Sequence, residues 1–182
     1  MRSLIRKSVV LLAVSLQIAG CQAHTSAISP STSTPTWAVA FSPSGGCTPL
    51  IVSTLGQAKS TILVQAYSFT SAPIAQALVD AAKRGVKVDV ILDKSQRTEH
   101  YSEADFLAHD GIPVSIDAVH AIAHNKVMVI DDETVITGSF NFTKAAEEHN
   151  AENLIVLHDK SLATQYRANW EKHRAHSQPY GP

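Results

Sequence analysis

The amino-acid sequence predicts an α/β fold, in which one mixed β-sheet carries helices on both faces as an α/β/α sandwich in a single domain. From Trp37 onward, short runs rich in β-branched residues alternate at close spacing with helical patterns. Such alternation is typical of strands that pair in one sheet while the intervening helices cover its two faces. Two later strand patterns are separated only by the turn Asp131-Asp132-Glu133, so we expect them to pair antiparallel and make the sheet mixed.

The strand patterns are short apolar or alternating runs bounded by turn residues or charged residues. The first pattern, residues 37–41, ends at the turn sequence SPSGG. Residues 61–67 (TILVQAY) form an almost continuous apolar run, whereas residues 86–92 (VKVDVIL) alternate. The expected strands are 37–41, 61–67, 86–92, 113–116, 126–130, 134–137 and 153–157.

The helical patterns place apolar residues three and four positions apart. In the clearest pattern, Ile74, Leu78 and Ala81 share one face, and Gly85 follows two basic residues where the helix should end. The expected helices are 49–59, 74–84, 103–109 and 161–173.

Composition excludes several classes of protein. The chain has 182 residues, enough for one domain with a sizeable core. Its 15 basic and 16 acidic residues give a formal charge of -1, which excludes a protein that holds nucleic acid by bulk positive charge. Eight glycines and eight prolines exclude a collagen-like chain, and two cysteines exclude a disulfide scaffold.

The N-terminus has the pattern of an export signal. Basic residues precede the apolar run 9–18, whose helix would be about 15 Å long, half of a bilayer core. Residues 1–20 are therefore expected to be a signal peptide. The sequence IAGC that ends at Cys21 resembles the bacterial lipobox, which would make Cys21 the lipidated first residue of a membrane-anchored lipoprotein. The alternative is an ordinary small-x-small cleavage site before His24, and either route exports the domain to the periplasm.

Residues 21–36 are expected to form a flexible linker, because they are mostly Ser, Thr, Pro and Ala and cannot bury enough apolar surface to fold. The remaining domain is 37–182. Without residues 1–20 the chain keeps 12 basic and 16 acidic residues, a formal charge of -4. Cys47 is then the leftover cysteine, and we expect it to be a small buried hydrophobe.

The residues with chemical potential are concentrated between His124 and Glu152. His124 and Lys126 are two positions apart, so if the strand begins near His124 both side chains lie on the same side, about 6.6 Å apart. Ser139 and Asn141 follow the next strand. An imidazole, an ammonium, a hydroxyl and a carboxamide together suit a phosphoryl group, with the first as nucleophile or base and the others as donors to its oxygens. Composition alone leaves open a structural histidine and a solvated lysine.

The pattern H-x-K-x4-D-x6-G-S-x-N resembles the signature of the phospholipase D superfamily, and the chain matches every specified position. The surrounding segments AYSFT (66–70), AAKRGV (81–86) and TGSFNFT (137–143) are similar to those of small exported bacterial endonucleases of that superfamily, the Nuc type. The resemblance covers about residues 40–180 and implies a phospholipase D-like catalytic domain.

The resemblance also implies roles for the motif residues. His124 would attack phosphorus to form a phosphohistidine, while Lys126, Ser139 and Asn141 would bind the non-bridging oxygens. Glu152, as a buried carboxylate, would hydrogen-bond the catalytic histidine and fix its tautomer. Asp131 would be mainly structural and brace the turn between the two motif strands; the simpler alternative is an ordinary turn residue.

A single motif per chain implies a homodimer, because larger members of the superfamily carry two copies whose histidines work in one site. A two-fold pair of chains would bring together two copies of His124, one as nucleophile and one as acid and base. No metal or other cofactor is implied. His120 lies four residues before His124, but we interpret it as a loop residue rather than a ligand.

Further residues at strand ends could line the site. Lys94, Arg97 and Lys144 could contact flanking phosphates, although charged loop ends are often only solvated. Tyr67 and Ser68 could line the cleft or stack a base. For the neighbouring Phe69 core packing is the expected role.

The predicted activity is metal-independent hydrolysis of DNA or RNA without sequence preference, since the motif binds a phosphodiester and no base-reading element is evident. The charge of -4 implies modest, salt-sensitive affinity. The alternative is phospholipase D-type hydrolysis of phospholipid headgroup esters, although no apolar lid for acyl chains is evident. A third hypothesis is a non-catalytic lipoprotein that binds polyanions.

Overall fold

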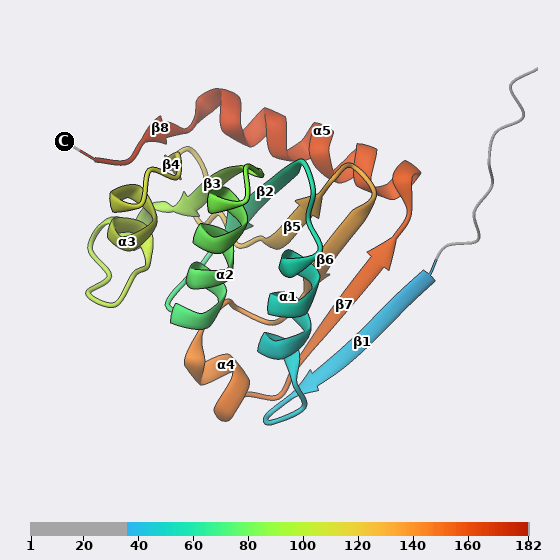
Figure 1. The fold of residues 1–182 in the computed structure, drawn as a ribbon. Helices are drawn as coiled ribbons and strands as arrows, with labels where there is room; N and C mark the ends of the chain where they lie inside the picture. Colours follow the sequence, from blue (N-terminus) through green and yellow to red (C-terminus); the bar gives the residue numbers. More distant parts are fainter. Residues whose placement is uncertain (1–35, 182) are drawn as a thin grey trace, which may run out of the picture. The chain divides into compact units, whose positions relative to one another are not determined.

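The computed structural model describes residues 36–181, which contain one eight-stranded mixed sheet with helices on both faces (Figure 1). The expected signal peptide 1–20, the lipobox-like Cys21 and the linker up to residue 35 lie outside the described residues. Among the described helices, none is long and apolar enough to span a bilayer.

The strands and helices follow the order expected from the sequence. The strands are β1 (Thr36–Ser42), β2 (Thr61–Ala66), β3 (Lys87–Asp93), β4 (Val114–Asp117), β5 (Lys126–Ile130), β6 (Thr134–Gly138), β7 (Glu152–His158) and β8 (Gln178–Pro179). The helices are α1 (Cys47–Gly56), α2 (Ala72–Lys83), the 3-10 helix η1 (Lys94–Arg97), α3 (Ala104–His109), α4 (Lys144–Glu148) and α5 (Lys160–His176).

The strand order in the sheet is β1-β7-β6-β5-β2-β3-β4-β8. Strands β2, β3 and β4 are parallel, whereas β5 pairs antiparallel with the other side of β2 and continues into an antiparallel block with β6, β7 and β1. The pairing of neighbouring strands therefore changes from parallel to antiparallel at β2. Sheets of this kind bind ligands outside the carboxyl ends of the parallel strands, beside such a switch point.

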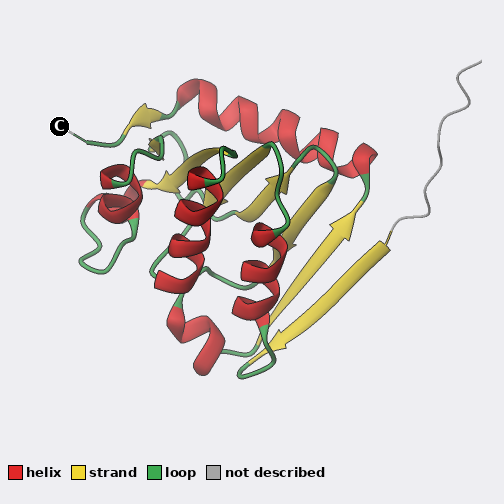
Figure 2. Cartoon of the chain, viewed as in Figure 1, coloured by secondary structure: helices red, strands yellow, loops and turns green. Residues whose placement is uncertain are grey.

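Helices lie on both faces of the sheet (Figure 2), and each face has its own hydrophobic core. The larger core packs one face against α1, α2, α3 and α4 and includes the fully buried Cys47, as expected. Burial, and secondarily Glu147, raises the pKa of the Cys47 thiol to about 11, so this thiol is protonated and inert. The smaller core packs the opposite face against Ala163 and Trp170 of α5.

Alternation along β5 serves both cores at once. Val127 and Val129 pack toward α5, while Met128 and Ile130 belong to the larger core. Lys126 begins the strand on the same side as Met128, the side of α1 and α2. Lys126 therefore lies where β5 begins, beside the carboxyl end of β2, and on the face of the sheet that carries the larger core.

The sequence prediction is confirmed for the long elements and incomplete for three short ones. η1, α4 and the two-residue β8 are absent from the expected set. Contacts with distant segments stabilise α4 and β8: Gly46 N and Thr48 N donate to the Glu147 carboxylate of α4, and β8 pairs with β4.

Candidate active site

The loop of residues 118–125 carries His124 from β4 to β5 across the carboxyl ends of β3 and β2. The backbone N–H of Tyr67, just after β2, donates to Asn125 O at 2.8 Å. The backbone N–H of Ala123 donates to Asp93 Oδ2 at 2.7 Å, and Asp93 lies buried at the end of β3. The residues on both sides of His124 are therefore fixed by the two central parallel strands.

Lys126 contacts the imidazole of His124 directly. Its Nζ lies 3.0 Å from Nδ1 and 3.1 Å from Nε2, and it donates to the His124 carbonyl oxygen at 2.9 Å. The strand begins at Lys126 rather than at His124, but the expected placement of both side chains on one side is confirmed. The Tyr67 ring packs 4.5 Å from the His124 ring, centroid to centroid, and 5.2 Å from Lys126 Nζ.

The environment of Lys126 is unusual for an ammonium group. The residue is 6% exposed, whereas His124 is exposed to solvent. Burial lowers the pKa of Lys126 below its ordinary value, and the nearby Glu152 carboxylate offsets part of that effect. A positive charge held out of water beside an accessible imidazole acts strongly on any anion that binds there.

Gly138 allows the loop after β6 to turn tightly around β7. Its φ is 149°, and an added Cβ would lie 2.2 Å from Asn153 O, so no other residue fits without displacing the backbone. The backbone N–H groups of Ser139 and Phe140 both donate to that same carbonyl oxygen.

Ser139 and Glu152 bind each other, which differs from their expected roles. Ser139 Oγ donates to Glu152 Oε2 at 2.6 Å and accepts from Asn153 N, while Asn150 Nδ2 donates to Glu152 Oε1. The expected hydrogen bond from Glu152 to His124 is not among the contacts of the described residues, and Glu152 is only half-buried. The reason is the β6–β7 register, which pairs Gly138 with Leu154 and leaves Ser139 facing the start of β7.

Asn141 lines an open pocket of about 570 Å³ at this edge of the sheet. Its Oδ1 is buried without a hydrogen-bond partner among the described residues, so the carboxamide oxygen is not committed to holding the fold. The next residue, Phe142, accepts backbone hydrogen bonds from Thr70 and Ser71 and packs against Phe69. The pocket is lined by Tyr67, Ser68, Thr70, Glu99, Tyr101, Asn141, Thr143, Lys144 and Ala145.

Asp131 lies away from these residues, at the other end of β5. Asp131 lies five positions after Lys126, about 16 Å further along the direction of β5. Its carboxylate accepts hydrogen bonds from the backbone N–H groups of Lys59, Ser60 and Thr61 and from the Ser60 hydroxyl. These contacts favour the structural interpretation of Asp131 over a catalytic one, and the turn that its carboxylate stabilises is the one between α1 and β2.

The three candidate phosphate-contacting cations occupy different places. Lys144 lines the pocket and is 3.7 Å from Glu148 in an exposed ion pair. Lys94 is exposed, but its Nζ donates to His120 O at 3.0 Å and so fastens the loop that carries His124. Arg97 lines a separate hollow beside Asp105 and Tyr180. Of these three residues, only Lys144 lines the pocket beside Asn141, which we call the motif pocket, and could contact a ligand there.

The aromatic expectations hold, and one functional residue was missed. Tyr67 and Ser68 line the pocket, and Phe69 is fully buried in the core. Asp93 was not singled out from the sequence, although its carboxylate orders the residue before His124. An acidic residue that ends a buried strand was the available signal, because such a side chain lies at the edge where ligands bind.

An accessible histidine, a buried lysine and an asparagine that lines the pocket, all at the carboxyl edge of the parallel strands, define a phosphoryl-transfer site. Comparison with known proteins agrees. The family model described as "Cardiolipin synthase, PLD-like domain" matches residues 51–174. The chain belongs to the phospholipase D superfamily, and it is a phosphodiester hydrolase of that superfamily.

Relatives and solved structures extend this result. "Phospholipase D" from Rickettsia felis is 46% identical over 135 residues, which is 74% of this chain and 68% of the relative. The crystal structure of a phospholipase D family member, Nuc from Salmonella typhimurium, superposes with a TM-score of 0.78 at 40% identity and covers 81% of this chain and 99% of Nuc. NucT from Helicobacter pylori gives a TM-score of 0.73 at 26% identity, covering 80% and 99%. "Mitochondrial cardiolipin hydrolase" from Chlamydomonas reinhardtii is 31% identical over 65% of this chain and 53% of the relative.

Proposed function

We propose that the protein is a metal-independent phosphodiesterase that hydrolyses DNA and RNA without sequence preference through a phosphohistidine. One observation carries the proposal: the buried ammonium of Lys126 is held against the exposed imidazole of His124, whose ring packs on Tyr67 at the wall of an open pocket. An anion that replaces water there gains the full effect of the fixed charge. A phosphodiester is the anion that this combination of nucleophile and donors suits.

The proposed reaction has two displacements at phosphorus. A His124 nitrogen attacks and forms the N–P bond, while the bond to the leaving oxygen breaks and that oxygen takes a proton from an acid. Water, deprotonated by the same group, then displaces the imidazole and releases the second product. Lys126 and Asn141 bind the non-bridging oxygens as charge develops on them.

Ser139 is proposed to position a neighbouring loop rather than to bind a phosphate oxygen directly, which is the role that the motif suggests. Its single hydroxyl proton is directed at Glu152, so it is not free to donate to a phosphate oxygen at the same time. We assign Ser139 and Glu152 together to positioning the loop that ends at Asn141. The Glu152 carboxylate also favours the charged form of Lys126.

The acid is proposed to be His124 of a second chain, in a homodimer with one shared site. The surface beside the motif suits such a contact, because Tyr101 is 75% exposed, Val119 64% and Ile122 55%. Val119 and Ile122 lie in the loop that carries His124. Apolar side chains that are exposed around a half-complete site support a partner copy there.

Nucleic acid is the favoured substrate because of what lines the pocket. The walls offer hydroxyls, an amide and Lys144, and Tyr67 and Tyr101 give flat faces on which a base can stack. These contacts read a phosphate backbone rather than a base sequence. The fold match to Nuc supports the same assignment.

A second candidate function is hydrolysis of a phospholipid headgroup ester. It is favoured by the relatives named "Phospholipase D" and "Mitochondrial cardiolipin hydrolase". The proposed export to the periplasm, with an anchor at Cys21, would place the site beside a membrane. The lining of the pocket is more apolar than polar, which is also compatible with an acyl chain.

The test is hydrolysis of plasmid DNA and of RNA in EDTA, run beside fluorescent phosphatidylcholine and cardiolipin. We expect nicked and linear plasmid in EDTA, and loss of turnover by about 10⁴-fold or more in His124→Asn with its melting temperature unchanged. His109→Ala, at an exposed histidine outside the site, is the control. Faster lipid than DNA turnover would select the second function, and strict metal dependence or an active His124→Asn would contradict the chemistry.

The shared site has its own measurement. We expect the purified protein to elute as a dimer, and Ile122→Glu to give monomers that have lost activity, since a charge in an apolar contact is unfavourable. A fully active monomer would show that the second imidazole is unnecessary.

A further inference from the structure

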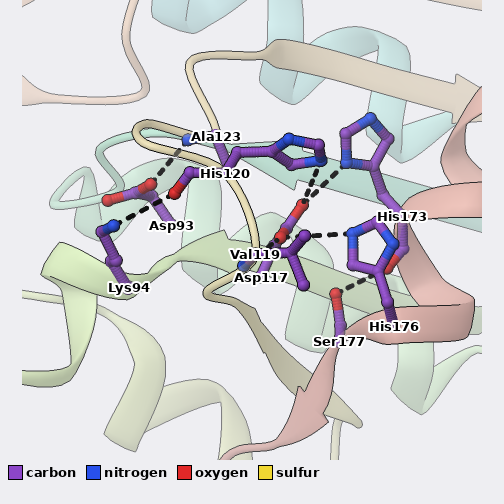
Figure 3. Close-up of polar contacts among 9 residues, drawn as sticks. All are labelled: Asp93, Lys94, Asp117, Val119, His120, Ala123, His173, His176 and Ser177. Atoms are coloured by element: carbon purple, nitrogen blue, oxygen red, sulfur yellow. Dashed lines mark hydrogen bonds and ion pairs between the residues drawn. The ribbon is translucent and has the colours of Figure 1, made fainter.

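A cluster of three histidines and one aspartate lies outside the motif pocket. Asp117 ends β4 and is fully buried, His120 lies in the loop 118–125, and His173 and His176 belong to the last turn of α5. Figure 3 shows the three imidazole rings gathered around the Asp117 carboxylate. Segments more than fifty residues apart in the sequence thus present their side chains to one point.

The ligand atoms are close enough for one ion. His173 Nδ1 lies 2.7 Å from Asp117 Oδ2, His176 Nε2 lies 3.2 Å from Oδ1, and His120 Nε2 lies 3.8 Å from Oδ2. One ligand atom from each residue lies within 4.8 Å of all the others. Neighbouring ligands on a tetrahedral zinc ion are about 3.3 Å apart, so a small inward movement closes the site.

We propose that Asp117, His120, His173 and His176 form a binding site for Zn²⁺. Imidazole nitrogens with one carboxylate oxygen are the donors that Zn²⁺ prefers, whereas Ca²⁺ and Mg²⁺ require oxygen ligands. Four ligands from the protein fill a tetrahedral shell and leave no open position for water activation. The site is therefore structural.

A hydrogen-bond network alone does not explain the third histidine. His173 and His176 both bond the carboxylate, but His120 at 3.8 Å is beyond hydrogen-bond distance and still turns its ring into the cluster. A metal ion recruits all three rings. The His120 side chain is 43% exposed and lies on a loop, so it is the member with room to move.

The carboxylate of the cluster has an outer hydrogen bond of the kind that metal ligands require. Val119 N donates to Asp117 Oδ1 at 3.2 Å. Such a hydrogen bond orients the ligating carboxylate. Burial acts to raise the pKa of Asp117, but the hydrogen bonds from His173 and His176 outweigh it and keep the carboxylate ionised.

The consequence of Zn²⁺ binding lies in the loop 118–125. His120 and His124 share that loop, and Lys94 and Asp93 already fasten it to the end of β3. An ion held by α5 and His120 would fix the other side of the loop. Because His124 itself is not a ligand, phosphodiester hydrolysis continues without the ion, and this inference stands or fails independently of the proposed substrate.

The test uses the purified full chain, stripped with EDTA and then freed of chelator. Calorimetric titration with ZnCl₂ is expected to give one ion per chain, and Co²⁺ is expected to give the visible absorption of a four-coordinate site. Zn²⁺ at about a hundred times its Kd should raise the melting temperature by about 5–10 °C. Absence of saturable binding, or a Co²⁺ spectrum of six-coordinate type, would overturn the proposal.

Variants separate this site from the other histidines of the chain. His120→Ala and His176→Ala, at partly exposed positions, should each weaken Zn²⁺ binding by about 100-fold or more and remove the thermal shift. His109→Ala, an exposed histidine of α3, should change neither. Unchanged affinity in His120→Ala would place the ion elsewhere and reject the cluster.

Discussion

The two ends of β5 are close in sequence and opposite in purpose. At the first end a buried Lys126 contacts an exposed His124, and at the other end Asp131 accepts hydrogen bonds from the turn between α1 and β2. A pocket lies at each end, about 570 Å³ beside Asn141 and about 430 Å³ beside Asp131. A conspicuous hollow therefore does not by itself locate the chemistry.

The difference between the ends is electrostatic. Lys126 is charged in a place that removes it from water, which costs stability and creates a strong local field. At Asp131, partial burial acts to raise the pKa, but hydrogen bonds from Thr61, Lys59 and Ser60 outweigh it and hold the pKa below its ordinary value. The positive charge of Lys126 lacks enough partners to offset its burial and can act on a ligand, so we call this the under-compensated end. The negative charge of Asp131 is offset by its hydrogen bonds and stabilises the fold, so we call that the compensated end.

The largest expected effect tests the under-compensated end. Lys126→Met should lower turnover of a small phosphodiester by about 10²–10³-fold. Its melting temperature should stay the same or rise, because the desolvation cost of the ammonium disappears while the chain keeps a similar volume. Lys144→Met, at an exposed lysine of the pocket beside Asn141, should change turnover much less. A parallel loss of folding and activity in Lys126→Met would contradict this division of roles.

The pH dependence of the wild-type rate tests the role of the Lys126 charge in a second way. Since the pKa of Lys126 lies below its ordinary 10.5, its positive charge is lost at a lower pH than that of an exposed lysine. The rate should therefore fall on the alkaline side below pH 10.5, and Lys126→Met should lack that decrease.

The next effect, at the compensated end, should appear in stability alone. Asp131→Ala should lower the free energy of unfolding by about 2–3 kcal/mol, because backbone donors at Lys59, Ser60 and Thr61 lose their acceptor. Turnover per folded molecule should be unchanged. Asp132→Ala controls for alanine at positive φ, since Asp132 has φ 57° and Asp131 has φ 53°. A loss of turnover in folded Asp131→Ala would show that Asp131 takes part in catalysis.

Acid titration sharpens the result for Asp131. A carboxylate whose folded pKa is lowered contributes stability above its unfolded pKa, and that contribution disappears as the pH falls through the folded value. The stability difference between the wild type and Asp131→Ala should therefore shrink in acid below about pH 4. Denaturant unfolding at neutral and acid pH measures this difference directly.

The same contrast explains how much the sequence could predict. Periodicity located the long strands and helices to within a few residues, because each has a continuous apolar face to bury. Motif spacing located His124, Lys126 and Asn141, since these three positions depend on one strand and the loop after its neighbour. Short elements such as α4 and β8 were not predicted because contacts from distant segments stabilise them: Gly46 N and Thr48 N donate to the Glu147 carboxylate of α4, and β8 pairs with β4.

Pairings between distant segments were beyond sequence reasoning. The choice of Ser139 rather than His124 as the partner of Glu152 follows from the β6–β7 register. The cluster around Asp117 combines a strand end, a loop and the last turn of α5, and its two halves lie more than fifty residues apart in the sequence. In both cases the deciding geometry is set by which segments the sheet brings together.

The smallest expected effect tests whether the loop before His124 is held from β3. Asp93→Ala removes the acceptor of Ala123 N and should lower kcat about 10-fold with little change in KM, because the imidazole is less well oriented while the phosphate-binding groups remain. Asp93→Asn keeps an oxygen that can accept from Ala123 N and should recover most of kcat. Asp80→Ala, at an exposed aspartate of α2, is the control. Equal losses of kcat in Asp93→Ala and Asp93→Asn, or losses of kcat that only follow the unfolded fraction, would contradict this role. Asp93 would then stabilise the fold, and β5 alone would position His124.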